Sequence, residues 1–448
     1  MQTLLEKYDV PGPRYTSYPT VPHWDSANHN EKVWKESLAN CFQQSDNEIS
    51  IYIHLPFCES LCTYCGCTTR ITKNHSVELT YIPYLLKEWR LYKNSLGEVP
   101  IIKEIHLGGG TPTFFSAENL KLLINGILLD CTLAEDFEFG FEGHPGNTTE
   151  AHLRVLASLG FTRVSFGIQD FDPLVQKTIN RKQSYQQVEE VCRLARKHGF
   201  TSINFDLIYG LPSQSLQSIE DTISKTIALA PNRIAYYSYA HVPWIKAAQL
   251  SYEEQLPCPK IKSKMYQLGK QLLTAAGYMD VGMDHFALPQ DNLYQAFLSG
   301  TLHRSFMGYT TQATKLLIGL GMSAISDSWT AFNQNHKLIY NYYQSLDRNE
   351  FPIFKGHQLT EDDLIVREHI LNLMCRFETL WNDKERLDLG MAYDLELLDT
   401  LQEDGLIIRD NYGIKVSDAG KPYIRNICMA LDKKLLSSTQ KIQFSQTV

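Results

Sequence analysis

Four cysteines within ten residues are the most chemically suggestive feature of the chain. Cys58, Cys62 and Cys65 follow the spacing Cys-x3-Cys-x2-Cys, and Cys67 comes two residues later. Three thiolates on a short loop can bind three irons of a cubane [4Fe–4S] cluster and leave the fourth iron open. An open iron can chelate the amino and carboxylate groups of S-adenosylmethionine (SAM), so that a transferred electron can split the C–S bond of SAM and release a radical. The spacing therefore predicts one such cluster, with Cys58, Cys62 and Cys65 as its ligands.

Two other interpretations of these cysteines fit less well. A structural zinc site usually has two separated ligand pairs, and no second Cys-x2-Cys or His-x3-His pair follows in the sequence. A redox-active pair formed by Cys62 and Cys65 would leave Cys58 unexplained. Cys67 is surplus to the cluster spacing and is interpreted as a buried or neighbouring thiol. The other six cysteines are scattered singly and are interpreted as small buried hydrophobes.

A glycine run is the second candidate binding segment. Gly108–Thr113 (GGGTPT) directly follows the strand candidate 103–107. Glycine lacks Cβ, so its backbone amides can approach a carboxylate or the backbone of an amino acid closely. The same run could also be a tight turn between a strand and a helix. Its position after a strand, in a chain with a cluster motif, favours the binding role.

Polar residues also recur where strand candidates end. Glu142, Gln169 with Asp170, Asp206, and the segment Tyr239–His241 each stand at the carboxyl end of such a strand. Barrel enzymes build their active sites at that face of the barrel. Each residue alone could be a strand-end cap or a solvated loop residue, but together they predict a site.

The elements that must position these residues alternate between strands and helices. The strand candidates are 51–55, 103–107, 137–142, 163–168, 202–207 and 233–239, with helical patterns at 76–96, 117–129, 149–159, 185–198 and 216–229. Their spacing suits βα units, because a parallel crossover needs about 30 residues. Six units predict an α/β protein with a partial (β/α)6 barrel. A doubly wound sheet would show the same alternation, and only a weaker strand candidate, 278–282, follows.

The pattern changes beyond about residue 355. Helices are predicted at 359–377 and 391–404, followed by a hairpin at 406–416 and a last helix at 422–436. This order resembles a winged-helix module, which often binds DNA. Residues 351–448 contain 12 Lys and Arg against 16 Asp and Glu, so the segment is interpreted as a packing or lid domain.

Composition limits the class of protein further. The 448 residues are 43% hydrophobic and 21% charged, as in ordinary globular proteins, and the net charge is −8. An acidic chain is a poor candidate for broad binding to nucleic acid or anionic membranes. No apolar run approaches the roughly 20 residues of a membrane span, and the first residues lack the pattern of a signal peptide. We therefore expect a cytoplasmic protein.

Several segments together resemble one known family. With Tyr64 as the aromatic residue before Cys65, the cysteine motif looks like the signature of the radical-SAM superfamily. Four further segments resemble the oxygen-independent coproporphyrinogen III dehydrogenase (oxidase) family of haem biosynthesis: Gly12–Thr20 (GPRYTSYPT), Gly282–Phe286 (GMDHF), Gly308–Gln312 (GYTTQ) and Arg425–Met429 (RNICM). The resemblance extends from about residue 8 to the C-terminus.

The resemblance implies an architecture and an activity. It implies an N-terminal extension (1–48), a radical-SAM partial barrel with its own C-terminal extension (49–350) and a mainly helical, winged-helix-like domain (351–448). The implied reaction is the oxidative decarboxylation of two propionates of coproporphyrinogen III to vinyls, which gives protoporphyrinogen IX. It would use one [4Fe–4S] cluster and two SAM molecules, with a reductant such as flavodoxin or ferredoxin. The implied state is a monomer that binds no nucleic acid.

The resemblance also assigns roles to particular residues. Tyr52, Glu142 and Ile325 would contact the SAM on the cluster, and Tyr52 and Arg181 would be catalytic. A fixed guanidinium such as Arg181 suits a SAM carboxylate. The residues that would contact a second SAM are Tyr64, Gly109, Gly110, Thr111, Gln169, Arg181, Asp206 and Ala240.

One position departs from the family pattern. The family usually has an acidic residue before the proline that follows Glu142, whereas this chain has His144 there, followed by Pro145. The change alters the local charge by up to two units. Two alternative functions stay open at this point: a related radical-SAM enzyme acting on haem or another tetrapyrrole, and a haem-binding chaperone. The chaperone relatives lack the GPRYTSYPT-like extension, which favours the enzyme.

Overall fold

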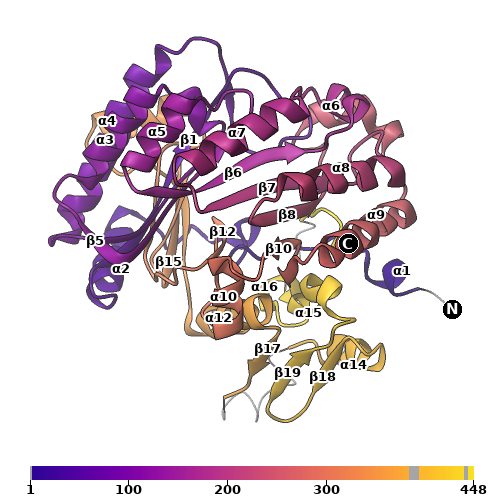
Figure 1. Cartoon of the computed structure of the whole chain (residues 1–448). Coiled ribbons are helices and arrows are strands. Elements are labelled where there is room, and N and C mark those ends of the chain that lie inside the picture. Colours follow the sequence, from indigo (N-terminus) through magenta and orange to yellow (C-terminus); the bar gives the residue numbers. More distant parts are fainter. Residues whose placement is uncertain (1–2, 383–392, 438–441, 448) are drawn as a thin grey trace.

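Six parallel strands form the centre of a twelve-stranded sheet in the computed structural model, which describes residues 3–382, 393–437 and 442–447 (Figure 1). Neighbouring strands pair in the same order as they occur in the sequence. They are β1 (Glu48–Leu55), β4 (Ile101–Gly109), β5 (Thr132–Gly143), β6 (Phe161–Gln169), β7 (Ser202–Tyr209) and β8 (Arg233–Ser238). The six predicted strands and the α/β barrel class are confirmed.

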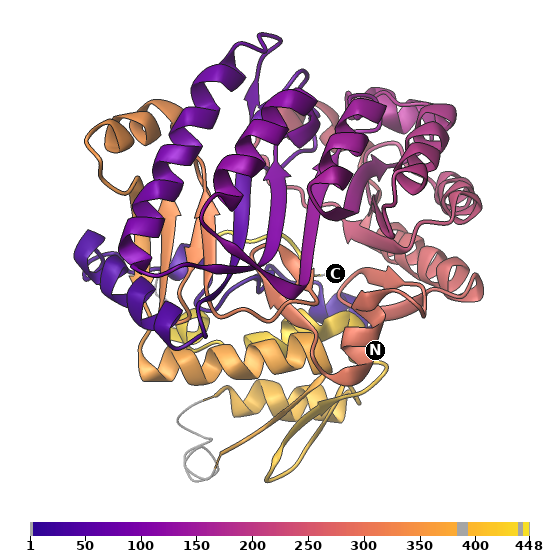
Figure 2. The same cartoon turned by 60° about the vertical axis from the view of Figure 1, so that its left-hand side comes forward.

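Helices cover the outer face of these strands (Figures 1 and 2). The hydroxyl side chains of Ser116, Thr149, Ser184 and Ser215 each accept a hydrogen bond from a backbone N–H in the first turn of a helix, which fixes where that helix begins. The helices of this layer are α3 (Val77–Leu96), α4 (Ala117–Leu128), α5 (Glu150–Ser158), α6 (Pro173–Thr178), α7 (Tyr185–Lys197), α8 (Leu216–Leu229) and α9 (Pro259–Ala275).

The sheet leaves the repeated βα pattern at both edges. The weak strand candidate 278–282 becomes β9 (Met279–Gly282), which pairs antiparallel with β10 (His285–Ala287), and β10 pairs antiparallel with β8. It is therefore not a seventh parallel unit. At the other edge, β13 (Leu317–Leu320) lies parallel to β1. Three antiparallel strands follow it: β14 (Ile325–Asp327), β15 (Ala331–Asn335) and β16 (Ile353–Gln358).

Shorter elements complete the barrel region. The two-stranded pairs are β2 (Phe57–Cys58) with β3 (Arg70–Ile71), and β11 (His303–Ser305) with β12 (Gly308–Thr310). The remaining helices before residue 350 are α1 (Leu4–Tyr8), η1 (Val21–His23), α2 (Glu31–Gln43), η2 (Pro112–Phe114), η3 (Ala247–Gln255), α10 (Asn292–Ser299) and α11 (Ile339–Asp347).

The C-terminal residues form helices and a small antiparallel sheet. The elements are α12 (Glu361–Arg376), β17 (Glu378–Leu380), α14 (Leu395–Glu403), β18 (Ile407–Arg409), β19 (Gly413–Val416), η4 (Lys421–Tyr423), α15 (Ile424–Met429) and α16 (Lys433–Ser437). The first two residues of the predicted helix 391–404 lie outside the described residues, and α14 covers most of the rest. The prediction of a single last helix at 422–436 is wrong, since α15 and α16 are separate helices. Between them the buried Asp432 accepts hydrogen bonds from Tyr15 Oη and from the backbone N–H of Leu435.

The N-terminal segment packs against two different cores. Trp34 and Leu38 of α2 belong to the core between the sheet and its helices. Tyr8, Tyr15 and Tyr18 instead belong to the core formed with the C-terminal helices, and residues 11 and 446 form an isolated bridge between the two ends of the chain. The predicted division at residues 48 and 350 stays a prediction. Among the described residues, no helix combines the length and the apolar character that crossing a bilayer requires.

Arg425 is the residue that ties the two ends together. Its guanidinium is buried and donates to the backbone carbonyls of Gly12, Pro13, Gln446 and Thr447. We expect Arg425→Ala to lower the free energy of unfolding by roughly 2–4 kcal/mol, because several hydrogen bonds to a charged group are lost. Arg425→Lys should recover only part of this loss, since an ammonium cannot reproduce the planar fork.

Limited proteolysis and thermal melting provide the measurement. The N-terminal twenty residues of Arg425→Ala should be cleaved faster than those of the parent protein, while the barrel fragment stays intact. Equal cleavage rates and equal melting temperatures would contradict the assignment.

Candidate functional site

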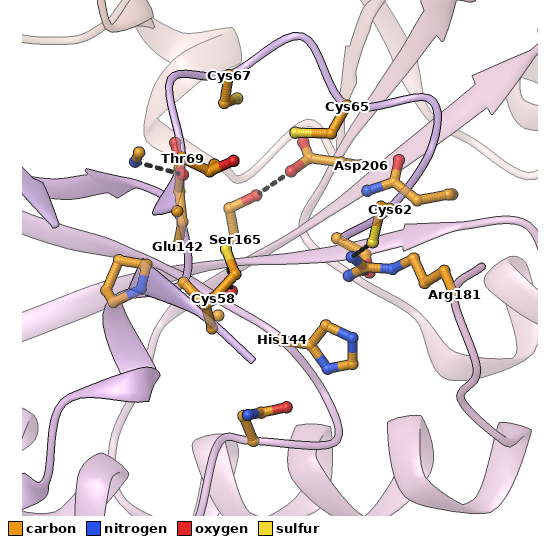
Figure 3. A pocket seen from close by; sticks show the side chains of 18 of the residues that line it. Cys58, Cys62, Cys65, Cys67, Thr69, Glu142, His144, Ser165, Arg181 and Asp206 are labelled. Carbon is orange, nitrogen blue, oxygen red and sulfur yellow. Dashed lines mark hydrogen bonds between the residues drawn. The ribbon is translucent and has the colours of Figure 1, made fainter. Parts of the chain in front are cut away.

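The carboxyl ends of the parallel strands open into a cavity of about 810 Å³. The loop that carries the cysteines crosses this opening, and all four of its cysteines line the cavity (Figure 3). Glu142, Arg181 and Asp206 face the same space from three other positions in the sequence. The fold therefore brings the cysteine motif and the strand-end polar residues to one site.

The surroundings differ from one thiol to the next. Thr111 Oγ1 lies 3.4 Å from Cys58 Sγ, and Arg181 Nη1 donates to Cys62 Sγ at 3.6 Å. Burial raises the pKa of the Cys58 thiol to about 11. A hydrogen bond from Cys67 lowers the pKa of the Cys65 thiol to about 6, and the same contact raises the pKa of Cys67. Cys67 thus interacts with one predicted ligand and is exposed rather than buried.

The residues present fit a [4Fe–4S] cluster. Within the described part of the chain, no three His, Cys, Asp or Glu side chains are arranged to hold a single metal ion. Three thiols that bind three different irons need not meet at one point, as the ligands of a single zinc ion must. Cys58, Cys62 and Cys65 border a common cavity and would hold the cluster there.

Segments from elsewhere in the chain hold the cysteine loop in place. Asn180 Nδ2 donates to the carbonyl oxygen of Leu61 at 2.7 Å, and Gln249 Nε2 donates to that of Tyr64 at 3.2 Å. Lys246 Nζ donates to the carbonyl oxygen of Cys67 at 2.8 Å. These bonds fix the loop backbone above the barrel.

The glycine run is required by close packing beneath the loop. A Cβ atom on Gly109 would lie 2.5 Å from the ring of His54, and one on Gly110 would lie 2.6 Å from the backbone of Pro56. Gly109 also has a φ of +109°, which favours glycine. Its backbone N–H donates to Glu142 Oε2 at 3.2 Å. The run is thus a tight turn that also lines the cavity, and its binding role stays a prediction.

Two carboxylates in the site have opposite pKa shifts. Burial alone would raise the pKa of Glu142, but the hydrogen bond and charge of His106 outweigh it and hold the pKa below its ordinary value. Burial raises the pKa of Asp206 to about 6, although Ser165 Oγ and Asn204 Nδ2 both donate to this carboxylate at 2.9 Å. Glu142 is therefore ionised near neutral pH, whereas Asp206 titrates close to it.

Among the described residues that line the cavity, Arg163 Nε is buried without a hydrogen bond but lies 3.3 Å from Glu138 Oε1. Two other buried polar atoms of the lining have neither a hydrogen bond nor an ion pair to a described residue. They are Gln169 Oε1 and Arg181 Nε. An unpaired buried polar atom costs about 1–3 kcal/mol, so these atoms favour a polar ligand that would pair them. Gln169 also has a φ of +67°, a strained conformation that occurs often in functional sites. The arrangement fits a zwitterionic, hydrogen-bonding ligand such as SAM.

Three of the predicted SAM contacts lie outside the lining of the cavity, as do the strand-end residues Asp170, Tyr239 and His241. Tyr52 Oη lies 3.0 Å from His54 Nδ1, and the Tyr52 ring stacks on His106, which does line the cavity. The carbonyl oxygen of Ala240 accepts from Gln249 Nε2 at 3.4 Å, and Ile325 packs against the cluster of Trp24, Phe332 and Leu359. The other predicted site residues, from Tyr64 to Asp206, line the cavity. Their individual roles stay predictions.

Sequence reasoning missed several lining residues. Arg163, Ser165 and Asn204 lie on β6 and β7 below the predicted Gln169 and Asp206. Along each strand they alternate with residues that point away from the cavity. The period of two along the strand could therefore have identified them as inward-facing. Further residues of the lining that sequence reasoning missed come from the later part of the chain: Arg233, Tyr237, His285, Leu293, Met307 and Tyr309.

His144, the departure from the family pattern, also lines the cavity. Its Nδ1 accepts a hydrogen bond from the backbone N–H of Gly146 at 3.0 Å, which leaves the proton of a neutral ring on Nε2. Burial, reinforced by the charge of Arg181, lowers the pKa of His144 to about 3. The imidazole is therefore a neutral group at neutral pH.

Comparison with known proteins agrees with this geometry. Residues 52–226 match the radical SAM superfamily. The oxygen-independent coproporphyrinogen III oxidase of a Synechocystis strain is 38% identical, over 99% of this chain and 97% of its own length. The enzyme of the same name from Pseudomonas aeruginosa is 37% identical, over 99% and 98%. This chain belongs to the oxygen-independent coproporphyrinogen III oxidase family.

The fold agrees as closely as the sequence. The solved structure of coproporphyrinogen III oxidase from Escherichia coli, described as a radical SAM enzyme, superposes with a TM-score of 0.88 at 36% identity. The superposition covers 94% of this chain and 97% of the other. The architecture of the superposed 94% of the chain is therefore that of this family.

The thiols generate a direct prediction about metal content. Replacing Cys58, Cys62 or Cys65 by Ala should remove most of the roughly four irons per chain expected after anaerobic preparation, because each thiolate binds its own iron. Cys67→Ala should keep most of the iron. Cys192→Ala, which removes a buried thiol on α7, is the control for the loss of any thiol. Full iron content in the Cys62 variant, or zinc in place of iron, would refute the ligand assignment.

Proposed function

We propose that this chain oxidatively decarboxylates two propionate side chains of coproporphyrinogen III to vinyl groups and so forms protoporphyrinogen IX without oxygen. The observation that carries the proposal is the cavity that three cluster thiols and the strand-end polar residues share in a chain of this family. For each vinyl group, the propionate loses one hydrogen atom from its β-carbon, one CO2 and one electron. The cluster and SAM would supply the radical that removes the hydrogen atom.

The residues of the chain contribute binding and orientation. Arg181 presents a fixed positive charge beside Cys62, and its unpaired Nε suits a carboxylate. Glu142, held ionised, can accept hydrogen bonds from an ammonium group. Gln169 Oε1 adds an acceptor that has no hydrogen-bond partner among the described residues. These groups together support the binding of an amino-acid zwitterion, as two SAM molecules would require.

The proposal extends to partners and location. The reaction needs one-electron reduction of the cluster, which we assign to a flavodoxin or ferredoxin, and an acceptor for the electron that the substrate loses. We propose a cytoplasmic monomer. The N-terminal extension favours the enzyme over a haem chaperone, because Tyr15 and Tyr18 of the GPRYTSYPT segment are buried in the C-terminal core.

Turnover with the defined substrate tests the proposal. Anaerobically reconstituted protein, supplied with SAM, dithionite and an electron acceptor, should convert coproporphyrinogen III to protoporphyrinogen IX. Two CO2 should form per product, together with methionine and 5′-deoxyadenosine. Haem added to the assay should not be consumed, and haem supplied in place of coproporphyrinogen III should not be converted to a product. SAM cleavage without vinyl formation would favour a related enzyme for another tetrapyrrole, and stoichiometric haem binding without SAM cleavage would favour the chaperone.

Arg181 gives a second prediction. Arg181→Ala should keep its iron but lose at least about ten-fold in the rate of vinyl formation, because a charged bidentate contact is lost. Arg181→Lys should stay impaired, since lysine offers no fork. Iron content, melting temperature and product formation are measured together. Full activity would refute the role, and joint loss of iron and activity would mean that the contact with Cys62 supports the cluster loop instead.

A further inference from the structure

The loop that carries the cluster cysteines reaches the protein surface. There it is bordered by the residues that follow it in the chain and by two segments from elsewhere in the sequence. β3, in the continuation, pairs with β2 at the start of the loop, Asn180 bonds to the carbonyl of Leu61, and Lys246 bonds to the carbonyl of Cys67. We call the resulting surface the cluster rim and define it as residues 58–73, 177–182 and 242–250. Its segments are far apart in the sequence but are joined by these contacts.

The cluster rim is basic in an acidic protein. It contains six Lys and Arg residues and a single acidic residue, Glu59, whereas the whole chain has a net charge of −8. Arg70, Lys73, Lys177 and Lys182 are exposed, and none of these four forms an ion pair within the described ranges. Glu59 lies 3.4 Å from His75 Nε2, a partner that offsets part of its charge. The rim therefore presents a net positive field.

Exposed apolar side chains lie among these charges. Ile245 is 67% exposed, Leu250 is 57% exposed and Trp244 is 48% exposed, and Leu61 and Ile71 are more than 40% exposed. Apolar contacts within a charged surround are typical of protein interfaces, where the charges steer the approach and the apolar groups lose water. A small anion would have no use for these apolar groups, so the surface favours a protein partner.

We propose that the cluster rim is the docking surface for an acidic one-electron carrier protein that reduces the cluster. This inference rests on the proposed function, because only a redox enzyme needs such a partner. Part of the rim borders the cavity beside the thiols, because Leu61, Lys73 and Lys182 line it together with Cys58, Cys62 and Cys65. The rest of the rim lies outside that lining and includes Arg70, Lys177, Trp244, Ile245 and Leu250. A protein bound to the rim would therefore contact the loop that carries the thiols. In each encounter the carrier is oxidised by one electron and the cluster is reduced by one.

Charge reversal outside the cavity tests the docking surface. Arg70 and Lys177 belong to the rim but do not line the cavity, so Arg70→Glu/Lys177→Glu should leave the binding of SAM and substrate unchanged. The matched control is Lys121→Glu/Arg154→Glu, which makes the same charge change at exposed positions on α4 and α5.

The first readout is binding rather than turnover. The Kd for a purified acidic flavodoxin is measured by calorimetric titration of the anaerobic holoenzyme. The rim variant should have a Kd about ten-fold higher or more than the parent protein, and the control variant should have nearly the same Kd as the parent. The parent Kd should also rise with added salt, because salt screens exposed charges. Equal Kd values in the rim variant and the parent protein would overturn the proposal.

The second readout separates this inference from the proposed function. Decarboxylation driven by flavodoxin and its NADPH-dependent reductase should slow in the rim variant, whereas decarboxylation driven by dithionite should keep its rate and its KM for coproporphyrinogen III. A raised KM in the dithionite assay would overturn the proposal, because the rim would then bind substrate carboxylates. Failure of the dithionite assay in the parent protein would count against the proposed function alone, and the flavodoxin Kd values would still decide the docking surface.

Discussion

The parallel arrangement of β1 and β4 to β8 is the constraint on which the rest of the site depends. Parallel strands place all of their carboxyl ends at the same end of the barrel, so residues that are far apart in the sequence meet there. Glu142, Gln169 and Asp206 converge in this way although they lie on three different strands, β5, β6 and β7. The cysteine loop starts from the same edge of β1 and crosses above these residues. The cluster thiols and the polar groups consequently share one enclosed space.

A buried network holds this edge in its strained shape. Asp170 accepts hydrogen bonds from the backbone N–H of Asp172, from Gln214 Nε2 and from Thr222 Oγ1. Gln183 Nε2 donates to the carbonyl oxygen of Ile168 on the other side of Gln169. The strained Gln169, which lines the cavity and whose Oε1 has no hydrogen-bond partner among the described residues, is thus fixed from both sides. Preorganisation of this kind lets a site bind a polar ligand without first reordering its own groups.

Much of this arrangement followed from local sequence patterns, and the rest depended on tertiary contacts. The six strands were predictable because each is a compact apolar run bounded by turn residues. The specific spacing of Cys58, Cys62 and Cys65 is what allowed them to be proposed as the cluster ligands. β14 and β15 are only three and five residues long and contain polar residues such as Asp327 and Asn333, so they lack the apolar run that would mark a strand, although β14 pairs with its neighbour β13 and β15 with β14. The separation of α15 from α16 depends on Asp432 meeting Tyr15, a residue more than 400 positions away. The site residues that were missed, such as Tyr309, likewise enter the cavity from the later part of the chain.

The central claim of this account is that three thiols hold a cluster whose fourth iron faces the cavity and is free to bind SAM. Electron paramagnetic resonance of the dithionite-reduced holoenzyme, recorded with and without SAM, tests this claim most directly. The account predicts that SAM shifts the g-values of the reduced cluster, and that SAM labelled with 17O at its carboxylate broadens the signal. A spectrum that saturating SAM leaves unchanged, in protein with about four irons per chain, would contradict the open iron and with it the proposed chemistry.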